Sequence, residues 1–217
     1  KPKALVEIGG KTLLDMAIER VWAAGVDEII VNTHYLEDLV IKHIENNYPG
    51  EKIAVSSEGT LLATGGGIKK VAWFFSGTGD FLVYNVDIVC NLDLEKFIQQ
   101  HRENGCTCTL SISKRGSSRY LHFDKDMLLC GWSNTRTGEI IESRKVGSYE
   151  KFGFNGIYVC QAKVLDFMES QPDVFSMTPF LLELAKKHKI KGIPLENSYW
   201  YDAGTVEKLK KVREKFQ

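Results

Sequence analysis

The chain has 217 residues, of which 43% are hydrophobic and 26% are charged, a composition typical of one compact globular domain. Its 28 basic and 28 acidic side chains cancel, and no segment concentrates Lys or Arg, which argues against nucleic-acid or anionic-membrane partners. No apolar stretch approaches the ~20 residues that span a bilayer. We therefore expect a single domain over residues 1–217 with small-molecule partners.

The cysteines indicate neither a disulfide framework nor a zinc site. Their number is odd, and none belongs to a C-x-x-C pair with a matching second half. They are Cys90, Cys106, Cys108, Cys130 and Cys160. We interpret them as reduced thiols of a cytoplasmic protein.

The first half of the chain alternates apolar, strand-like segments with amphipathic helices. This order is a βαβ series, which predicts an α/β fold. The expected strands are Ala4–Ile8, Glu28–Asn32, Lys52–Ser56 and Phe81–Val86, and the expected helices are Thr12–Ala24, Leu36–Asn47 and Gly66–Phe75.

After a predicted helix at Leu94–Glu103, the chain contains short β segments separated by turns. Alternating strands and helices then follow again. The short segments predict a meander or β insertion covering one side of a ligand crevice. They are Cys108–Ser113, Tyr120–Phe123, Leu128–Trp132 and Glu139–Ile141. The remaining expectations are strands at Gly156–Cys160 and Ile190–Pro194, with helices at Ala162–Glu169, Thr178–His188 and Val206–Lys215.

Two aspartates stand where strands are expected to end. Asp87 closes the run Phe81–Asp87, and Asp202 lies within Tyr199–Thr205. Ligands of open α/β sheets bind at the carboxyl ends of strands, and Mg²⁺ is commonly held by a few carboxylates together with substrate phosphates. The pair is therefore a candidate magnesium site. The alternatives are a turn or helix N-cap for Asp202, and for Asp87 a cap of the helix region after Asn91.

The segment Thr64–Ile68 contains three successive glycines at the start of a predicted helix. Glycines allow a ligand to approach the backbone closely, and a helix N-terminus presents free N–H groups. Such a turn is suited to a phosphate or to the polar edge of a base. A glycine turn required only by tight packing explains the segment as well.

Two more polar residues are candidates. Lys3 follows Pro2, which favours an extended backbone before it, and its ammonium group is suited to a phosphate, although most lysines near a chain end are solvated surface charges. Asn155 offers donors and an acceptor to a hydroxyl-rich ligand. The alternative for Asn155 is a plain Asn-Gly turn before a strand.

Five segments, taken in order, resemble the sugar-1-phosphate nucleotidyltransferases. They are Pro2–Leu14, which is similar to P-K-P-L-x-x-x-x-G-K-P-L-[IL], then Thr64–Gly67, Asn85–Asp87, Phe154–Tyr158 and Trp200–Thr205. Single motifs of this kind are weak signals, whereas five in order across nearly the whole chain are a strong one. The resemblance implies a Rossmann-like three-layer α/β/α mixed sheet, the nucleotide-diphospho-sugar transferase fold, with a small β insertion.

The resemblance also implies the chemistry and the residues that carry it. A sugar-phosphate oxygen attacks the α-phosphorus of a nucleoside triphosphate in line, and pyrophosphate leaves without a protein nucleophile. Asp87 and Asp202 would hold the catalytic Mg²⁺, and Lys3 would contact phosphate. Lys3 and Asp87 are thus the expected catalytic residues.

The substrate-binding residues follow from the same resemblance. Thr64, Gly65 and Gly66 would line the nucleotide base pocket. Asn155 would contact the sugar, and Arg119 falls in the sugar-side loop of the family.

Within the family, three segments are most similar to the short uridylyltransferases of N-acetylmuramate 1-phosphate and to mannose-1-phosphate guanylyltransferases. They are Tyr84–Ile88, Ser118–Leu121 and Cys130–Trp132. The expected substrates are therefore UTP with N-acetylmuramate or a related amino-sugar 1-phosphate, or alternatively GTP with mannose 1-phosphate. A monomer and a homodimer are both compatible with the sequence.

One departure from the family is that its G-x-G-x-R-[LM] loop, which precedes the P-K-P-L stretch, is absent here, together with the first strand. We expect upstream residues in the native protein. A non-catalytic nucleotide-sugar sensor or regulatory subunit would also explain the absent loop. A glycosyltransferase is disfavoured, because it usually carries Asp-x-Asp at its strand end and this chain reads Asp87-Ile88-Val89.

Overall fold

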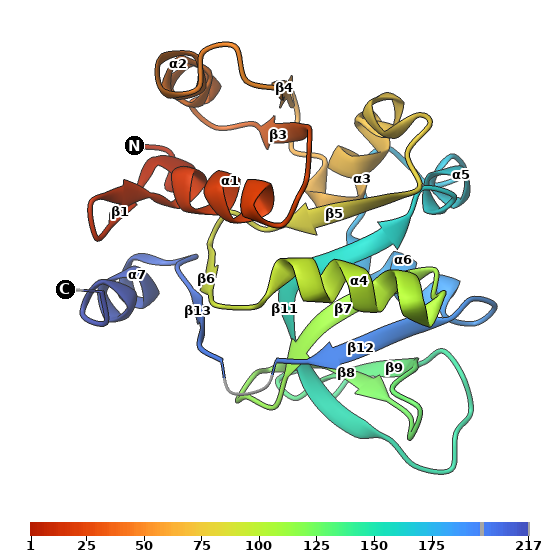
Figure 1. Cartoon of the computed structure of the whole chain (residues 1–217). Helices are drawn as coiled ribbons and strands as arrows, with labels where there is room; N and C mark the ends of the chain where they lie inside the picture. Colours follow the sequence, from red (N-terminus) through yellow and green to blue (C-terminus); the bar gives the residue numbers. More distant parts are fainter. Residues whose placement is uncertain (196–197, 217) are drawn as a thin grey trace. The chain divides into compact units, whose positions relative to one another are not determined.

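The computed structural model describes residues 1–195 and 198–216 (Figure 1). The chain forms two compact units. The first unit comprises Lys1–Leu62, Tyr84–Phe97 and Ser198–Gln217, and the second comprises Ala63–Val83 and Ile98–Asn197. Both units contain helices and strands, which confirms the α/β class. A single functional domain over residues 1–217 stays a prediction.

Three two-stranded sheets form in the described part of the first unit, together with three α-helices and a short 3₁₀ helix. The β3 and β4 pair is parallel, whereas β1 with β2 and β13 with β6 are antiparallel. The strands are β1 (Glu7–Ile8), β2 (Lys11–Thr12), β3 (Ile29–Thr33), β4 (Ile53–Ser57), β6 (Ile88–Cys90) and β13 (Trp200–Asp202). The helices are the 3₁₀ helix Lys3–Leu5, α1 (Leu13–Ala23), α2 (Glu37–Asn47) and α7 (Val206–Arg213).

The apolar faces of these elements bury two clusters in the first unit, which remove their side chains from water and so stabilise it. One cluster packs α1 against α2 through Leu5, Leu14, Ile18, Val40 and Ile44. The other packs α1, α7 and the β6–β13 pair through Ile8, Leu13, Val89, Ala203 and Val212.

The expected strand at Ala4–Ile8 was wrong. The chain forms a 3₁₀ turn at Lys3–Leu5 and then a tight hairpin, in which β1 pairs with β2 and Ile8 lies opposite Lys11. Gly9 and Gly10 connect the strands with φ angles of 58° and 83°. Two successive positive φ angles are the conformation of a two-residue hairpin turn, which glycine adopts without a steric penalty.

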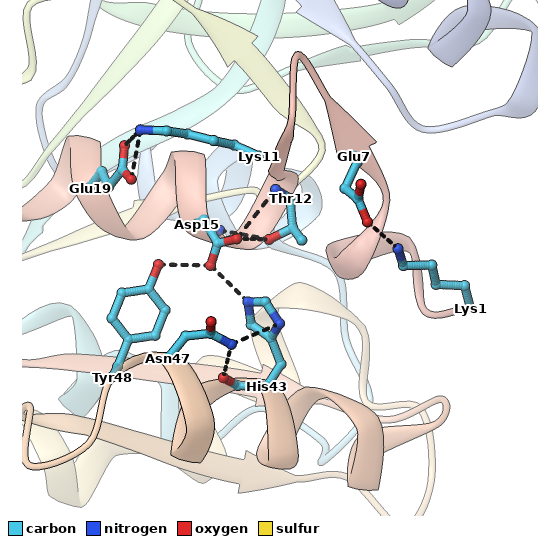
Figure 2. Close-up of polar contacts among 9 residues, drawn as sticks. All are labelled: Lys1, Glu7, Lys11, Thr12, Asp15, Glu19, His43, Asn47 and Tyr48. Atoms are coloured by element: carbon cyan, nitrogen blue, oxygen red, sulfur yellow. Dashed lines mark hydrogen bonds and ion pairs between the residues drawn. The ribbon is translucent and has the colours of Figure 1, made fainter.

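The predicted helix after this hairpin is confirmed as α1. The partly buried carboxylate of Asp15 on α1 forms hydrogen bonds with His43 of α2 and with Tyr48, which follows α2 (Figure 2). Thr12 caps α1 by accepting the Asp15 N–H, and Asp15 accepts the Thr12 hydroxyl at 2.6 Å. The other Asp15 oxygen accepts from Tyr48 Oη and from His43 Nε2, both at 2.7 Å. Burial opposes ionisation of Asp15, but these hydrogen bonds outweigh it and lower its pKa below the ordinary value.

We expect Asp15→Asn to lower the free energy of unfolding by about 1–3 kcal/mol at pH 7, because hydrogen bonds to the ionised carboxylate are lost. A depressed folded-state pKa gives stability that is present above the ordinary aspartate pKa and is lost as pH falls through the folded value. The difference between wild type and variant should therefore shrink below about pH 4. Urea unfolding between pH 3 and 8 measures this.

Glu19→Gln serves as the control for Asp15→Asn, since Glu19 on the same helix pairs with Lys11 while both side chains are about half exposed. It should change stability by less than about 1 kcal/mol. An Asp15→Asn deficit that persists unchanged at pH 3 would contradict the ionised role of Asp15.

In the second unit, a seven-stranded mixed sheet contributes many of the buried core side chains. Its order is β10-β9-β8-β11-β7-β12, with β5 also paired to β11. The strands are β5 (Asp80–Tyr84), β7 (Cys108–Ser113), β8 (Arg119–Phe123), β9 (Leu129–Asn134), β10 (Ile140–Glu142), β11 (Glu150–Gln161) and β12 (Ile190–Pro194). The helices are α3 (Ala63–Lys70), a 3₁₀ helix Ala72–Phe75, α4 (Leu94–Asn104), α5 (Val164–Met168) and α6 (Met177–Leu184), and α4 belongs to this unit from Ile98.

The β8–β10 meander is the predicted β insertion, and it continues the sheet through antiparallel pairs. Two other expectations in this unit were right only in part. The helix expected at Gly66–Phe75 is divided into α3 and a separate 3₁₀ turn. The strand expected at Gly156–Cys160 begins at Glu150, because β11 pairs first with β8 and then with β7.

Candidate functional site

The β6–β13 pair places the two candidate metal-binding aspartates on neighbouring segments of the first unit. Asp202, the last residue of β13, lies opposite Ile88, which directly follows Asp87. The Ala203 N–H donates to the Asp87 carbonyl oxygen at 2.8 Å. Two aspartates that are far apart in the sequence are thus brought together, as the sequence predicts.

Asp87 lies in a turn rather than at the end of the expected strand, because β5 ends at Tyr84 and a new strand begins at Ile88. The turn is fixed at both ends. The Ile88 N–H donates to the Asn85 carbonyl at 3.0 Å, and the Tyr84 hydroxyl donates to the Ile88 carbonyl at 2.9 Å. Local hydrogen bonds between Tyr84 and Ile88 therefore hold the turn that contains Asp87.

A lysine pairs with each carboxylate. Lys3 donates from Nζ to Asp87 Oδ2, and Lys208 of α7 donates from Nζ to Asp202 Oδ2 at 2.5 Å. The carboxylates are more buried than the ammonium groups, with exposed side-chain fractions of 22% and 25% against 43% and 51%. The site therefore brings two acidic and two basic side chains together.

Burial opposes ionisation of Asp202, but hydrogen bonds from Lys208 and from the Gly204 N–H, with the nearby charge of Lys3, outweigh it. They lower the pKa of Asp202 below its ordinary value. Asp202 is consequently an anion throughout the neutral range.

Gly204 leaves open the space that both carboxylates face. A Cβ atom at this position would lie 2.5 Å from Asp202 Oδ1, 3.1 Å from Asp87 Oδ2 and 3.3 Å from Lys3 Nζ. Two carboxylate oxygens thus converge on one point that only a glycine leaves free.

This donor set fits Mg²⁺, which is held by one or two carboxylates and takes its remaining oxygens from water and substrate phosphates. Residues 1–195 and 198–216 contain no cluster of three or more His, Cys, Asp or Glu side chains arranged to hold a metal ion. Asp87 and Asp202 would thus be the protein ligands of such a cation, and water or substrate phosphates would supply its other oxygens.

Other residues perform the capping roles that were the alternatives for these aspartates. Asp93 accepts the Lys96 N–H at 2.9 Å at the start of α4, and Thr205 accepts the Lys208 N–H at 3.3 Å at the start of α7. Only the turn alternative holds in part, because Asp202 Oδ1 also accepts the Gly204 N–H at 2.6 Å.

The glycine-rich segment lies in the second unit, at the start of α3. The N–H groups of Gly65 and Gly66 both donate to the Phe175 carbonyl, at 3.0 and 3.2 Å. A Cβ atom at Gly65 would lie 2.4 Å from the Phe175 ring. Tight packing therefore accounts for Gly65, and the base-binding role of Gly65 and Gly66 stays a prediction. Thr64 is exposed.

We expect Gly65→Ala to lower the free energy of unfolding by about 1–3 kcal/mol without any nucleotide, because the added methyl group would overlap the Phe175 ring. Alanine is otherwise the better helix former, so the sign of the change identifies the clash. Thermal unfolding measures it, with Gly116→Ala as the control because nothing lies within 4 Å of a Cβ there. Unchanged stability with lost nucleotide binding would instead favour the ligand role.

Asn155 is fully buried inside β11 rather than in a turn before a strand, which corrects the turn interpretation. Its Oδ1 accepts from Ser113 Oγ at 2.8 Å, and its Nδ2 donates to Ser111 Oγ at 3.2 Å. The pairing of β11 with β7 shifts register here, and Gly156 has a φ angle of 76°. The Asn-Gly pair therefore forms an irregularity within the strand.

Two arginines near the start of β8 differ in their exposure and contacts. Arg119, the predicted sugar-side residue, is exposed at the start of β8. Arg115 instead donates from Nη2 to the Phe154 carbonyl at 2.7 Å, and its guanidinium covers Gly153. Among the described residues, neither Thr64 nor Arg119 makes a side-chain hydrogen bond or ion pair. The sugar-binding roles of Asn155 and Arg119 stay predictions.

Sequence reasoning missed three residues that shape these sites: Gly204, Lys208 and Arg115. A signal existed for the first two, since Asp-Ala-Gly-Thr followed by a basic residue three positions after the Thr indicates a capped helix that carries a cation close to Asp202. Nothing in the local pattern distinguishes Arg115 from Arg119, because they occupy the same polar loop.

Residues 1–217 match the model of the Nucleotidyl transferase family. A Caulobacter vibrioides N-acetylmuramate alpha-1-phosphate uridylyltransferase is 27% identical, covering 96% of this chain and 86% of that protein. An Aneurinibacillus thermoaerophilus D-glycero-alpha-D-manno-heptose 1-phosphate guanylyltransferase is 25% identical, covering 100% and 90%.

Among solved structures, HddC from Yersinia pseudotuberculosis complexed with GMP-PN matches with a TM-score of 0.75 at 26% identity, covering 100% of this chain and 91% of that one. This likeness confirms the predicted nucleotide-diphospho-sugar transferase fold. In the described part of the chain, none of the helices combines the length and apolarity needed to cross a membrane.

Proposed function

Because the chain belongs to the nucleotidyl transferase family, whose model matches residues 1–217, we propose that it joins a nucleoside triphosphate to a sugar 1-phosphate in a Mg²⁺-dependent reaction. Sugar-1-phosphate nucleotidyltransferase activity is supported by the relatives of this chain. The magnesium requirement, the substrates and a cytoplasmic location are the proposed parts.

The observation that carries the proposal is the convergence of Asp87 and Asp202 on the space left by Gly204, with Lys3 beside them. Stability alone does not explain why two partly buried carboxylates lie close together, since exposed ion pairs contribute little to stability. They suit a reaction in which phosphate charge has to be held and neutralised.

In this reaction the chain supplies binding and charge, and no covalent intermediate on the protein is needed. Asp87 and Asp202 would hold Mg²⁺, which supplies Lewis-acid stabilisation of the α-phosphate when bound. Lys3 is oriented by Asp87 and neutralises charge that develops on a phosphate oxygen. Pyrophosphate is the leaving group, and the sugar phosphate oxygen forms the new bond to the α-phosphorus.

We propose UTP with N-acetylmuramate 1-phosphate or a related amino-sugar 1-phosphate as the substrates. The similarity to an N-acetylmuramate alpha-1-phosphate uridylyltransferase supports this pair. The alternative is GTP with mannose 1-phosphate, and the similarity to a guanylyltransferase and to a GMP-PN complex supports the nucleotide of this alternative.

Pyrophosphate release with Mg²⁺ tests the proposal, with UTP, GTP, CTP and dTTP each crossed against hexose and amino-sugar 1-phosphates. The expected result is release that depends on one nucleotide–sugar pair and stops when Mg²⁺ is chelated. Nucleotide binding without release for any pair would reject the enzyme and favour a non-catalytic nucleotide-sugar sensor or regulatory subunit.

A further inference from the structure

Lys208 has no role in the mechanism above, yet it forms an ion pair with one of the two metal-binding carboxylates. Its Nζ lies 2.5 Å from Asp202 Oδ2, just as Lys3 Nζ pairs with Asp87 Oδ2. Each carboxylate proposed to hold a cation therefore already has an ammonium group as its counterion. A divalent cation has to compete with these two lysines.

The position of Lys208 is unfavourable for the helix that carries it. It lies in the first turn of α7, where Thr205 accepts the Lys208 N–H. Free N–H groups give a helix N-terminus a partial positive charge, which disfavours cations there. The contact with Asp202 offsets this repulsion, so the position is explained by the site rather than by helix stability.

The pair between Lys208 and Asp202 is also easy to break. The Lys208 side chain is 51% exposed, and pairs of this kind add little to stability because water competes for both charges. Lys208 has a long, flexible side chain, so its ammonium can leave Asp202 for another anion nearby.

We propose that Lys208 is a displaceable counterion that holds Asp202 in the metal-free protein and binds a phosphate oxygen of the nucleotide once a divalent cation occupies the carboxylates. This inference rests on the proposed function. It makes the metal site weak without phosphate and stronger with it, so that cation and nucleotide bind together. Lys208 is a second phosphate-binding lysine beside Lys3.

Mn²⁺ and inorganic pyrophosphate serve as the probes, and electron paramagnetic resonance measures free Mn²⁺ in solutions of the whole chain. Lys208→Met should bind Mn²⁺ about two- to fivefold more tightly than wild type without phosphate, because the competing ammonium is gone. With Mn²⁺ saturating, the same variant should bind pyrophosphate about two- to fivefold more weakly.

Lys210→Met is the matched control, since Lys210 is exposed on the same helix and its removal changes the net charge equally. It should shift both affinities by less than Lys208→Met does. Equal behaviour of the two variants, or weaker Mn²⁺ binding by Lys208→Met, would overturn the proposal.

A third variant distinguishes this proposal from the proposed function. Asp202→Asn should weaken Mn²⁺ binding, and unchanged Mn²⁺ binding by that variant would reject the metal site itself. The opposite shifts in Mn²⁺ and pyrophosphate affinity would still support the role of Lys208 if no nucleotide–sugar pair were turned over. In that case only the assigned reaction would fail.

Discussion

Asp202→Asn should reduce turnover about 10²- to 10⁴-fold while changing the free energy of unfolding by less than about 1 kcal/mol. The amide keeps the size and can still accept the Gly204 N–H, but it loses the charge that would hold Mg²⁺. Its ion pair with Lys208 is partly exposed, so the loss of the pair costs little stability. Asp87→Asn should behave in the same way.

Steady-state kinetics at saturating Mg²⁺ and urea unfolding of the same preparations measure the two effects. Asp93→Ala is the control with the opposite pattern, because Asp93 caps α4. It should lower stability by about 1 kcal/mol and leave turnover close to wild type. Near-native turnover by Asp202→Asn would remove Asp202 from the metal site.

The elements that the sequence predicts well are those with local signals. The helix after Thr12 has its cap and its apolar face in the sequence, and the β meander has turn residues between short apolar segments. The proximity of the two aspartates could also be predicted, because each follows an apolar segment whose carboxyl end is where α/β proteins place their ligands, whereas their role as metal ligands stays a proposal.

What the sequence does not reveal depends on contacts between distant segments. The sequence predicts one strand at Phe81–Val86, but the strand ends at Tyr84 and the chain turns at Asn85–Ile88 before β6 pairs with β13. Asn155-Gly156 reads as a turn, yet serines on β7 bind the Asn155 side chain within the sheet. The approach of Asp87 to Asp202 depends on the same long-range β6–β13 pair.

Gly204→Ala should reduce turnover about 10²-fold or more, although neither a charge nor a metal ligand is changed. The added Cβ would lie 2.5 Å from Asp202 Oδ1 and 3.1 Å from Asp87 Oδ2, so the carboxylates have to separate. Gly204 does not have a positive φ angle, so the backbone tolerates alanine and the effect is confined to the space between the two side chains.

The measurements are turnover and Mn²⁺ affinity, both of which should fall, together with a free energy of unfolding within about 1–2 kcal/mol of wild type. Gly59→Ala is the control in the same unit, because nothing lies within 4 Å of a Cβ there. If Gly204→Ala kept wild-type Mn²⁺ affinity and turnover, the space between the carboxylates could not be the cation site. The two aspartates would then act only as partners of Lys3 and Lys208, and the ligands of the catalytic cation would have to lie elsewhere.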